Sequence, residues 1–136
     1  MSKTCALPRS TFPVRFEVKS PVHALKLAKG LIRAYKHWAT DAFAVRRNKA
    51  GELEGVPTKS VKAEALCALG ALYRVNTVHA KEAERFLMEA AGELNGGEKD
   101  VLTLNDKEHT RENHKLVLAM FDRAIELAKE SEKESK

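Results

Sequence analysis

The segment from Thr110 to about Glu130 constrains the fold more than any other part of the sequence. Its apolar residues recur with the 3.6-residue period of an α-helix and cover a wide arc rather than a narrow stripe. Other elements have to cover so wide an apolar surface, so we expect this helix at the centre of the core. Thr110 is a suitable N-cap residue for it. The apolar positions are Leu116, Val117, Met120, Phe121, Ala124, Ile125, Leu127 and Ala128.

A second amphipathic pattern begins at Ser20, which can cap a helix whose first position is Pro21. The period continues to about Ala39, with an apolar face on one side and only cations on the other. The apolar face comprises Val22, Leu25, Ala28, Ile32, Tyr35 and Ala39, and the basic stripe comprises Lys26, Lys29, Arg33 and Lys36.

The remaining segments complete a mainly helical architecture. Short apolar runs at residues 43–45 and 53–56 flank a Gly-containing turn, which predicts a β-hairpin. Helical periods predict a helix over about 60–75, capped by Thr58 or Ser60 and with Val61 facing inward. A further helix is predicted from Asn76 or Thr77 to about Leu94, and Asn95-Gly96-Gly97 ends it. Residues 101–104 are predicted as a short strand or an extended link. We therefore expect a compact bundle of about four helices with a short β-hairpin after the first helix.

With 136 residues, the chain has the length of one domain. Residues 21–130 are predicted to form that domain. Residues 1–20 form a basic leader in which Val14 to Val18 alternate apolar and charged residues, as an edge strand or a segment lying across the surface would. Residues 131–136 contain no apolar residue, so we expect this tail to fray.

Charge is divided unevenly along the chain. Residues 1–50 hold eleven Lys and Arg against two acids, a net charge of +9, and residues 51–136 hold thirteen against seventeen, a net charge of −4. A basic half of this kind suits an acidic macromolecule, either a protein or a nucleic acid. The alternative is that the two halves complement each other within one fold, and that the cations form a solvated face. The predicted binding residues are Lys26, Lys29, Arg33, Lys36, Arg46, Arg47 and Lys49.

The most concentrated polar cluster lies at the start of the last predicted helix. A helix N-terminus attracts anions, and a carboxylate beside an imidazole can orient a general base. The candidate catalytic residues are Asp106, His109 and His114, and the candidate pocket residues are Asn105, Asp106, Thr110, Asn113 and His114. The alternative is structural: Asp106 or Thr110 caps the helix, while Asn113 and His114 bond to loop carbonyls.

Other chemistries lack their usual sequence signals. The chain contains no HExxH, CxxC, Walker A, GxGxxG or GxSxG pattern, so we expect no metal and no cofactor. Cys5 and Cys67 are too few for a disulfide framework, and the small apolar neighbours of Cys67 favour a core position over a nucleophile. No apolar run is long enough to span a membrane and no secretory signal pattern is present. These features predict a protein of the reducing cytoplasm without a membrane partner.

The run Cys67-Ala68-Leu69-Gly70-Ala71-Leu72, followed by Leu104-Asn105-Asp106 and Thr110, resembles the pattern of a small family of unknown function in bacteria and their phages. That pattern reads Trp-Cys-Ala-x-Gly-Ala-Leu, then Trp-Asn-Asp, then Arg-Thr and an amphipathic helix, and the resemblance covers roughly residues 22–129. Leu66 and Leu104 replace the two tryptophans and His109 replaces the arginine, which argues against an aromatic-lined pocket. The resemblance implies a compact, mostly helical domain and carries no activity. It is compatible with a phage or mobile-element protein that binds and blocks a host factor.

From these features we expect a non-enzymatic binding protein that uses its basic N-terminal face on an acidic partner, although the sequence does not exclude an enzyme. The first alternative is a small-ligand or hydrolytic pocket around Asp106. The second alternative is an oligomeric scaffold, in which a homo-oligomer forms through the small residues around Gly70.

Overall fold

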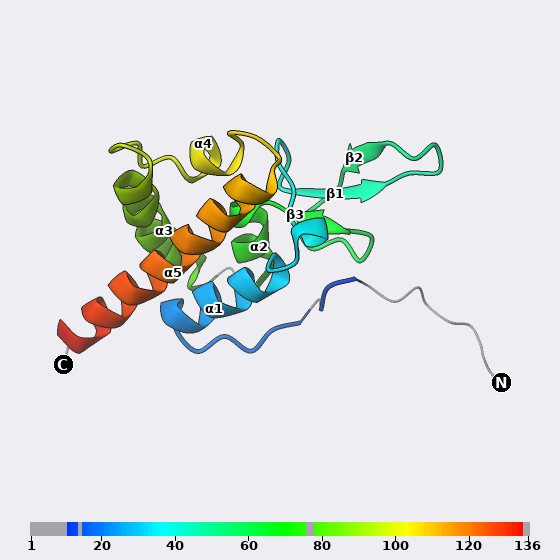
Figure 1. Cartoon of the computed structure of the whole chain (residues 1–136). Coiled ribbons are helices and arrows are strands. Elements are labelled where there is room, and N and C mark those ends of the chain that lie inside the picture. The colour runs from blue at the N-terminus through cyan, green and yellow to red at the C-terminus, as the bar shows by residue number, and fades with distance from the viewer. Residues whose placement is uncertain (1–10, 14, 76–77, 135–136) are drawn as a thin grey trace.

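The computed structural model describes residues 11–13, 15–75 and 78–134. Within these residues the protein is mainly helical, with a small three-stranded antiparallel sheet after the first helix, as predicted (Figure 1). The sheet lies at one end of the molecule, and the C-terminal end of α5 lies at the other. The helices are α1 (Pro21–Leu31), α2 (Ala68–Val75), α3 (Ala80–Leu94), α4 (Val101–Asn105), α5 (Arg111–Glu134) and the short 3-10 helix η1 (Tyr35–His37); the strands are β1 (Ala44–Arg47), β2 (Leu53–Gly55) and β3 (Ala65–Leu66).

Helix α5 is the central element that its wide apolar arc predicts. It packs against α3 and α1, and its buried side chains include Val117, Met120, Phe121 and Ala124. Thr110 caps it, because the Thr110 Oγ1 accepts a hydrogen bond from Asn113 N at 3.1 Å. The helix extends to Glu134, four residues beyond the end predicted near Glu130. The Glu and Lys residues of this end favour helix without any need for burial.

Helix α1 begins as predicted but ends early. Ser20 Oγ accepts a hydrogen bond from His23 N at 3.1 Å, and Pro21 occupies the first helical position. The predicted continuation to Ala39 is wrong, because the helix ends at Leu31. The His114 ring lies at hydrogen-bond distance from the Ile32 carbonyl oxygen (2.7 Å), which satisfies an acceptor that the next helical turn would otherwise occupy.

The sheet contains the predicted hairpin and one strand that the sequence did not reveal. The strand order is β2-β1-β3, with β1 pairing antiparallel to both neighbours. The predicted helix over 60–75 is therefore wrong in its first half, since Ala65 and Leu66 form β3 and the helix begins at Ala68. Val61, expected to face the core, is 51% exposed.

The second half of the chain differs from the prediction at α4 and agrees with it at the end of α3. Residues 101–104, predicted as a strand or an extended link, belong to the short helix α4. The Asp100 carboxylate caps this helix by accepting hydrogen bonds from Leu102 N (3.0 Å) and Thr103 Oγ1 (2.9 Å). Helix α3 begins at Ala80 and ends at Leu94 before Asn95, as its glycine signal predicts, with Gly96 at a φ of 62°. The caps predicted at Asn76 or Thr77 lie outside the described residues.

The described part of the N-terminal segment, residues 11–13 and 15–20, contains no strand. In this part, Phe16 and Val18 are partly buried and pack against the main core. Phe12 is buried, and Arg74 of α2 donates hydrogen bonds to the carbonyl oxygens of Phe12 (3.2 Å) and Pro13 (3.0 Å). Val14 and residues 1–10 lie outside the described residues.

Candidate functional site

The predicted basic residues are divided among several elements. Because α1 ends at Leu31, the expected uninterrupted stripe on one helix does not form: Lys26 and Lys29 lie in α1, and Lys36 lies in η1. Two of the seven cations pair with acids, since Lys29 Nζ lies 2.5 Å from Asp122 Oδ1 and Arg46 Nε lies 3.4 Å from Glu54 Oε2. The other five are exposed and form no ion pair with another described residue: Lys26, Arg33, Lys36, Arg47 and Lys49.

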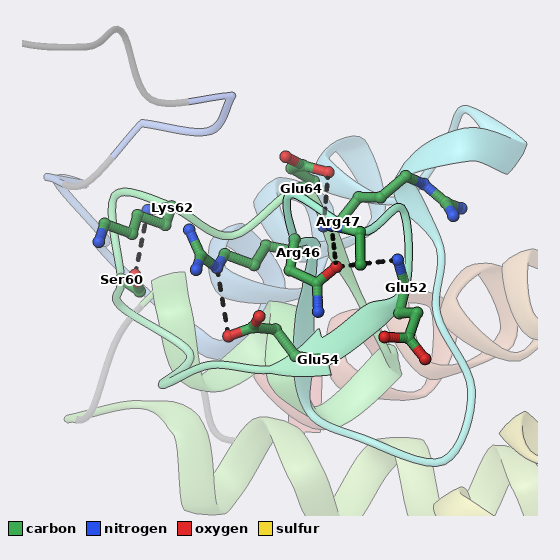
Figure 2. Close-up of polar contacts among 9 residues, drawn as sticks. Arg46, Arg47, Glu52, Glu54, Ser60, Lys62 and Glu64 are labelled. Atoms are coloured by element: carbon green, nitrogen blue, oxygen red, sulfur yellow. Dashed lines mark hydrogen bonds and ion pairs between the residues drawn. The ribbon is translucent and has the colours of Figure 1, made fainter.

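Strand pairing sends the two arginines of β1 to opposite faces of the sheet. Arg46 lies opposite Glu54, its ion-pair partner, whereas Arg47 lies opposite Leu53. Side chains alternate between the faces of a strand, so Arg47 shares its face with Val45 and, across the pairing, with Ala65. Figure 2 shows the guanidinium groups of Arg46 and Arg47 leaving the strand in different directions. The Arg47 guanidinium donates a hydrogen bond to the Gly51 carbonyl oxygen in the hairpin turn.

This second face of the sheet forms a groove of about 480 Å³, which we call the sheet groove. Its floor is made of the small apolar residues Ala39, Val45 and Ala65, which form a hydrophobic cluster separate from the main core. Lys36 and Arg47 are its two cations, and Leu53 is an apolar wall residue. Leu53 is 61% exposed, so it offers apolar surface to solvent. The groove thus combines an apolar floor with two unneutralised cations.

The rest of the groove lining comes from the segment after η1 and from the loop before α5. Thr40, Asp41 and the ring of His109 complete the wall, and Trp38 contributes only an edge because it is 1% exposed. Asp41 has a φ of 66°, an uncommon conformation for a non-glycine residue. Its backbone N–H donates a hydrogen bond to Asp106 Oδ1 at 3.0 Å, which helps to hold this turn.

Two of the predicted pocket residues form buried hydrogen bonds that hold the fold together. Asn105 Oδ1 accepts hydrogen bonds from Trp38 Nε1 (2.8 Å) and Ala68 N (3.0 Å), while Asn105 Nδ2 donates to the Ala39 carbonyl oxygen (3.1 Å). Asn113 Nδ2 donates to three backbone carbonyl oxygens. The structural alternative for Asn113, bonding to loop carbonyls, is therefore confirmed. Both asparagines are buried.

The two histidines of the cluster contact backbone carbonyls rather than each other. His114 is buried against the Ile32 carbonyl oxygen. His109 Nε2 lies 3.0 Å from the Trp38 carbonyl oxygen, and the His109 ring stacks on the Trp38 ring with centroids 4.7 Å apart. The hydroxyl of Tyr35 lies 3.1 Å from His109 Nδ1. Both ring nitrogens of His109 therefore have partners within the protein.

Asp106 lies beside a smaller cavity on the other side of the same turn. This cavity, of about 200 Å³, is lined by Asp41, Ala42, Phe43, Leu102 and Asp106. Asp106 Oδ1 accepts hydrogen bonds from Asn105 Nδ2 (2.7 Å) and from Asp41 N (3.0 Å). No histidine lines the cavity within the described residues. The structure thus brings Asp106 next to Asn105 but does not bring it into a hydrogen bond with His109 or His114.

Cys67 is a core residue, as predicted, although it precedes α2 instead of lying within a helix. Burial raises the pKa of its thiol to about 11, so the thiolate nucleophile is scarce at neutral pH. Among the described residues, no three His, Cys, Asp or Glu side chains gather as a metal site would require. None of the described helices has the length and apolar character needed to cross a membrane.

Sequence reasoning identified the cations of the sheet groove but missed its floor. Val45, Leu53 and Ala65 become neighbours only through strand pairing, and Ala65 was assigned to a helix. Ala39 was assigned to the inner face of a helix that ends before it. Val45 and Arg47 are two positions apart in a strand of the predicted hairpin, and this spacing is the one sequence signal that places them on the same face.

These features define a small, mainly helical protein that carries a groove on the exposed face of a sheet. Residues 17–127 match the model of a family of unknown function, DUF6197, and the chain belongs to that family. This confirms the expectation of an uncharacterised family spanning most of the chain. Neither a curated protein nor a solved structure matched it.

Proposed function

We propose that the chain is a non-enzymatic binding protein that engages an acidic macromolecular partner through cations of its N-terminal half, with the sheet groove at the centre of the contact. One observation carries the proposal: Lys36 and Arg47 come from different elements, line the same groove and form no ion pair with a described residue. Cations that the fold does not neutralise remain available for a partner.

Electrostatics around the groove supports the same assignment. The lining holds two Lys and Arg side chains against one carboxylate, that of Asp41. Outside the lining, the Arg111 guanidinium lies 4.6 Å from the centre of the Tyr35 ring, and the Glu64 carboxylate accepts a hydrogen bond from Arg47 N at 3.0 Å.

A finer version of this proposal also specifies what kind of protein the partner is. If the chain is encoded by a phage or mobile element, the acidic partner is a host factor whose activity the protein inhibits. This version is supported only by the resemblance of residues 67–72 and 104–110 to a pattern found in bacteria and phages. The small-ligand or hydrolytic pocket around Asp106 stays an alternative prediction that no specific observation favours.

Salt-titrated binding to polyanions tests the proposal. Fluorescent mixed-sequence DNA, mixed-sequence RNA and poly-glutamate are titrated with the full chain at several salt concentrations, and anisotropy is measured. The double variant Lys36→Glu/Arg47→Glu is compared with Lys26→Glu/Lys49→Glu, a matched control whose two exposed cations do not line the groove. We expect affinity for at least one polyanion to fall steeply with salt, and the groove variant to weaken it at least tenfold more than the control. Equal effects of the two variants, or no binding at low salt, would contradict the proposal.

A further inference from the structure

The floor of the sheet groove shows what kind of acidic partner fits it. Ala39, Val45 and Ala65 are small and nearly buried, so the floor is apolar and has room above it for one larger side chain. Leu53 stands beside this floor with most of its side chain in solvent. A ligand that brings an apolar side chain to this place removes exposed apolar surface from water, whereas a purely ionic ligand leaves it wet.

The aromatic residues near the groove do not offer a platform for nucleic-acid bases. Trp38 is 1% exposed, and its ring is stacked on that of His109. Single-stranded nucleic acids bind proteins by stacking bases on exposed rings along a track of several cations. The groove lining provides only two cations, and its one exposed aromatic ring, that of His109, has one face covered by Trp38. These features favour a protein segment over a nucleic acid.

Sheet geometry sets the length of the segment. The groove runs across four adjacent chain segments: β2, β1, β3 and residues 38–39, which lie next to β3 through the Ala39 N–H to Leu66 carbonyl hydrogen bond (2.9 Å). Two steps between adjacent chain segments separate Arg47 in β1 from residues 38–39, which follow Lys36; they amount to about 10 Å, which an extended peptide covers in about three residues. Arg47 and Leu53 lie toward the β2 side of the groove, and Lys36 belongs to the segment at the other side.

We propose that the sheet groove holds an extended acidic peptide segment of a partner protein, with two carboxylates about three residues apart and an apolar side chain between them. The carboxylates pair with Lys36 and Arg47, and the apolar side chain packs on Val45, Ala65 and Leu53. Asp41 disfavours a third carboxylate between the two, because like charges repel at close range. This inference rests on the proposed function and specifies its ligand.

Selection from a random heptapeptide library displayed on phage, with the immobilised full chain as bait, tests the inference. We expect enriched sequences to carry two Asp or Glu separated by about two residues, one of them apolar. The most enriched peptide is then synthesised with a fluorescent label, and its affinity is measured for the wild type, Lys36→Gln, Leu53→Ser and the control Lys81→Gln, which changes an exposed cation of α3. Leu53→Ser changes an exposed side chain and leaves every charge in place, so the variant should fold normally.

Lys36→Gln and Leu53→Ser should each weaken peptide binding by about fivefold, while Lys81→Gln should change it less than twofold. Enrichment of no sequence, enrichment without acidic residues, or an unchanged affinity in Leu53→Ser would overturn the peptide inference. The proposed function would survive any of these results if poly-glutamate, DNA or RNA still bound in a salt-dependent way that needed Lys36 and Arg47. Loss of both kinds of binding would overturn both proposals.

Discussion

Asn105 is the residue on which the arrangement around the sheet groove depends most. Its side chain joins three elements, because it bonds to Trp38 and Ala39 beside η1, to Ala68 at the start of α2 and to Asp106 after α4. Trp38 and Ala39 in turn line the groove. A buried amide with all its hydrogen bonds formed fixes one geometry, since any displacement leaves buried polar groups without partners.

Replacing Asn105 by Ala should therefore destabilise the protein by about 3 kcal/mol, because the Trp38 indole N–H and the Ala68 N–H lose their buried acceptor. Urea denaturation followed by circular dichroism measures this change. Asn95→Ala is the matched control, since the side chain of Asn95 forms no hydrogen bond with a described residue. A change in Asn105→Ala no larger than that in the control would contradict this role.

Tyr73 should make the stability of the folded state depend on pH in the alkaline range. Burial, followed by the 2.6 Å hydrogen bond that its hydroxyl donates to Glu84, raises the pKa of Tyr73 from 10.0 to about 12. The folded state therefore holds this proton more tightly than the unfolded state. The resulting contribution to stability is present below pH 10 and is lost as the pH rises towards 12.

Stability should consequently fall more steeply between pH 10 and 12 in the wild type than in Tyr73→Phe, which has no proton to lose in that range. Denaturant titrations at four or five pH values in this range give the two slopes. Parallel slopes would show that the Tyr73 hydroxyl titrates alike in the folded and unfolded chains.

At the scale of the secondary-structure elements, the contact between α2 and the start of β1 leaves no space for a side chain larger than that of glycine. A Cβ atom placed on Gly70 would lie within 1.9 Å of the carbonyl oxygen of Phe43, the residue just before β1. Phe43 also accepts a hydrogen bond from Cys67 N at 3.0 Å. The small residues around Gly70 thus allow α2 to approach the sheet inside one chain. These small residues are buried within the chain, so they do not form the exposed surface that the predicted self-association would use.

Gly70→Ala should destabilise the protein by about 2 kcal/mol or more, because α2 has to move away from Phe43. Gly30→Ala is the control: it lies in α1, and an added Cβ meets nothing within 4 Å, so it should stabilise the helix by about 0.5 kcal/mol. Thermal unfolding of both variants checks the contrast. Equal melting temperatures would mean that the approach of α2 to Phe43 is not tight.

The sequence identifies those elements whose local signals agree with their tertiary contacts. Both helix starts at Ser20 and Thr110 have caps, and the helix end before Asn95 has its glycines, so these boundaries were predicted. At the end of α1 the Ile32 carbonyl contacts His114, a residue distant in sequence, so local periodicity did not reveal this boundary. The apolar run at residues 65–66 suits a strand as well as a helix, and only pairing with β1 decides between them.

The sequence predicted single residues of the candidate site but not how they come together in space. Lys36 and Arg47 were identified from charge, but their meeting in one groove follows from the early end of α1 and from strand pairing. The polar cluster after α4 was recognised, yet the buried bonds of Asn105 and Asn113 to distant backbone atoms could not be read from the sequence. Long-range contacts therefore account for what the sequence did not reveal.

At the scale of the whole molecule, Arg74 ties together parts of the chain that are far apart in sequence. Arg74 is 1% exposed, and its guanidinium donates hydrogen bonds to the carbonyl oxygens of Pro13 in the N-terminal segment and of Thr58 (2.7 Å) and Ser60 (2.8 Å) in the loop before β3. Burial lowers the pKa of this guanidinium. The bonds hold the N-terminal segment and that loop against α2.

Arg74→Lys should loosen the N-terminal segment, because an ammonium group has too few donors to replace the planar guanidinium. Trypsin should then cleave after Arg15 and Lys19 several times faster than in the wild type, as followed by mass spectrometry. Arg85→Lys, an exposed position on α3, should leave these rates unchanged. Cleavage at the wild-type rate in Arg74→Lys would show that other contacts hold the segment.

The charge of the whole chain, +5, is less informative about a partner than where its unpaired cations lie. Ion pairs neutralise Lys29 and Arg46 within the fold, whereas Lys36 and Arg47 flank an apolar floor. The central claim is therefore local: an acidic ligand occupies the sheet groove. Trp38 is the only tryptophan of the chain and borders this groove, so its fluorescence reports on the site itself.

The most direct measurement is a titration of the full chain with poly-glutamate at low salt, in which Trp38 emission and ligand anisotropy are recorded together. We predict a saturable change in emission that follows the anisotropy, is lost in Lys36→Glu/Arg47→Glu and persists in Lys26→Glu/Lys49→Glu. Binding seen by anisotropy with no change in Trp38 emission, or an equal emission change in both double variants, would contradict the claim that the groove is the binding site.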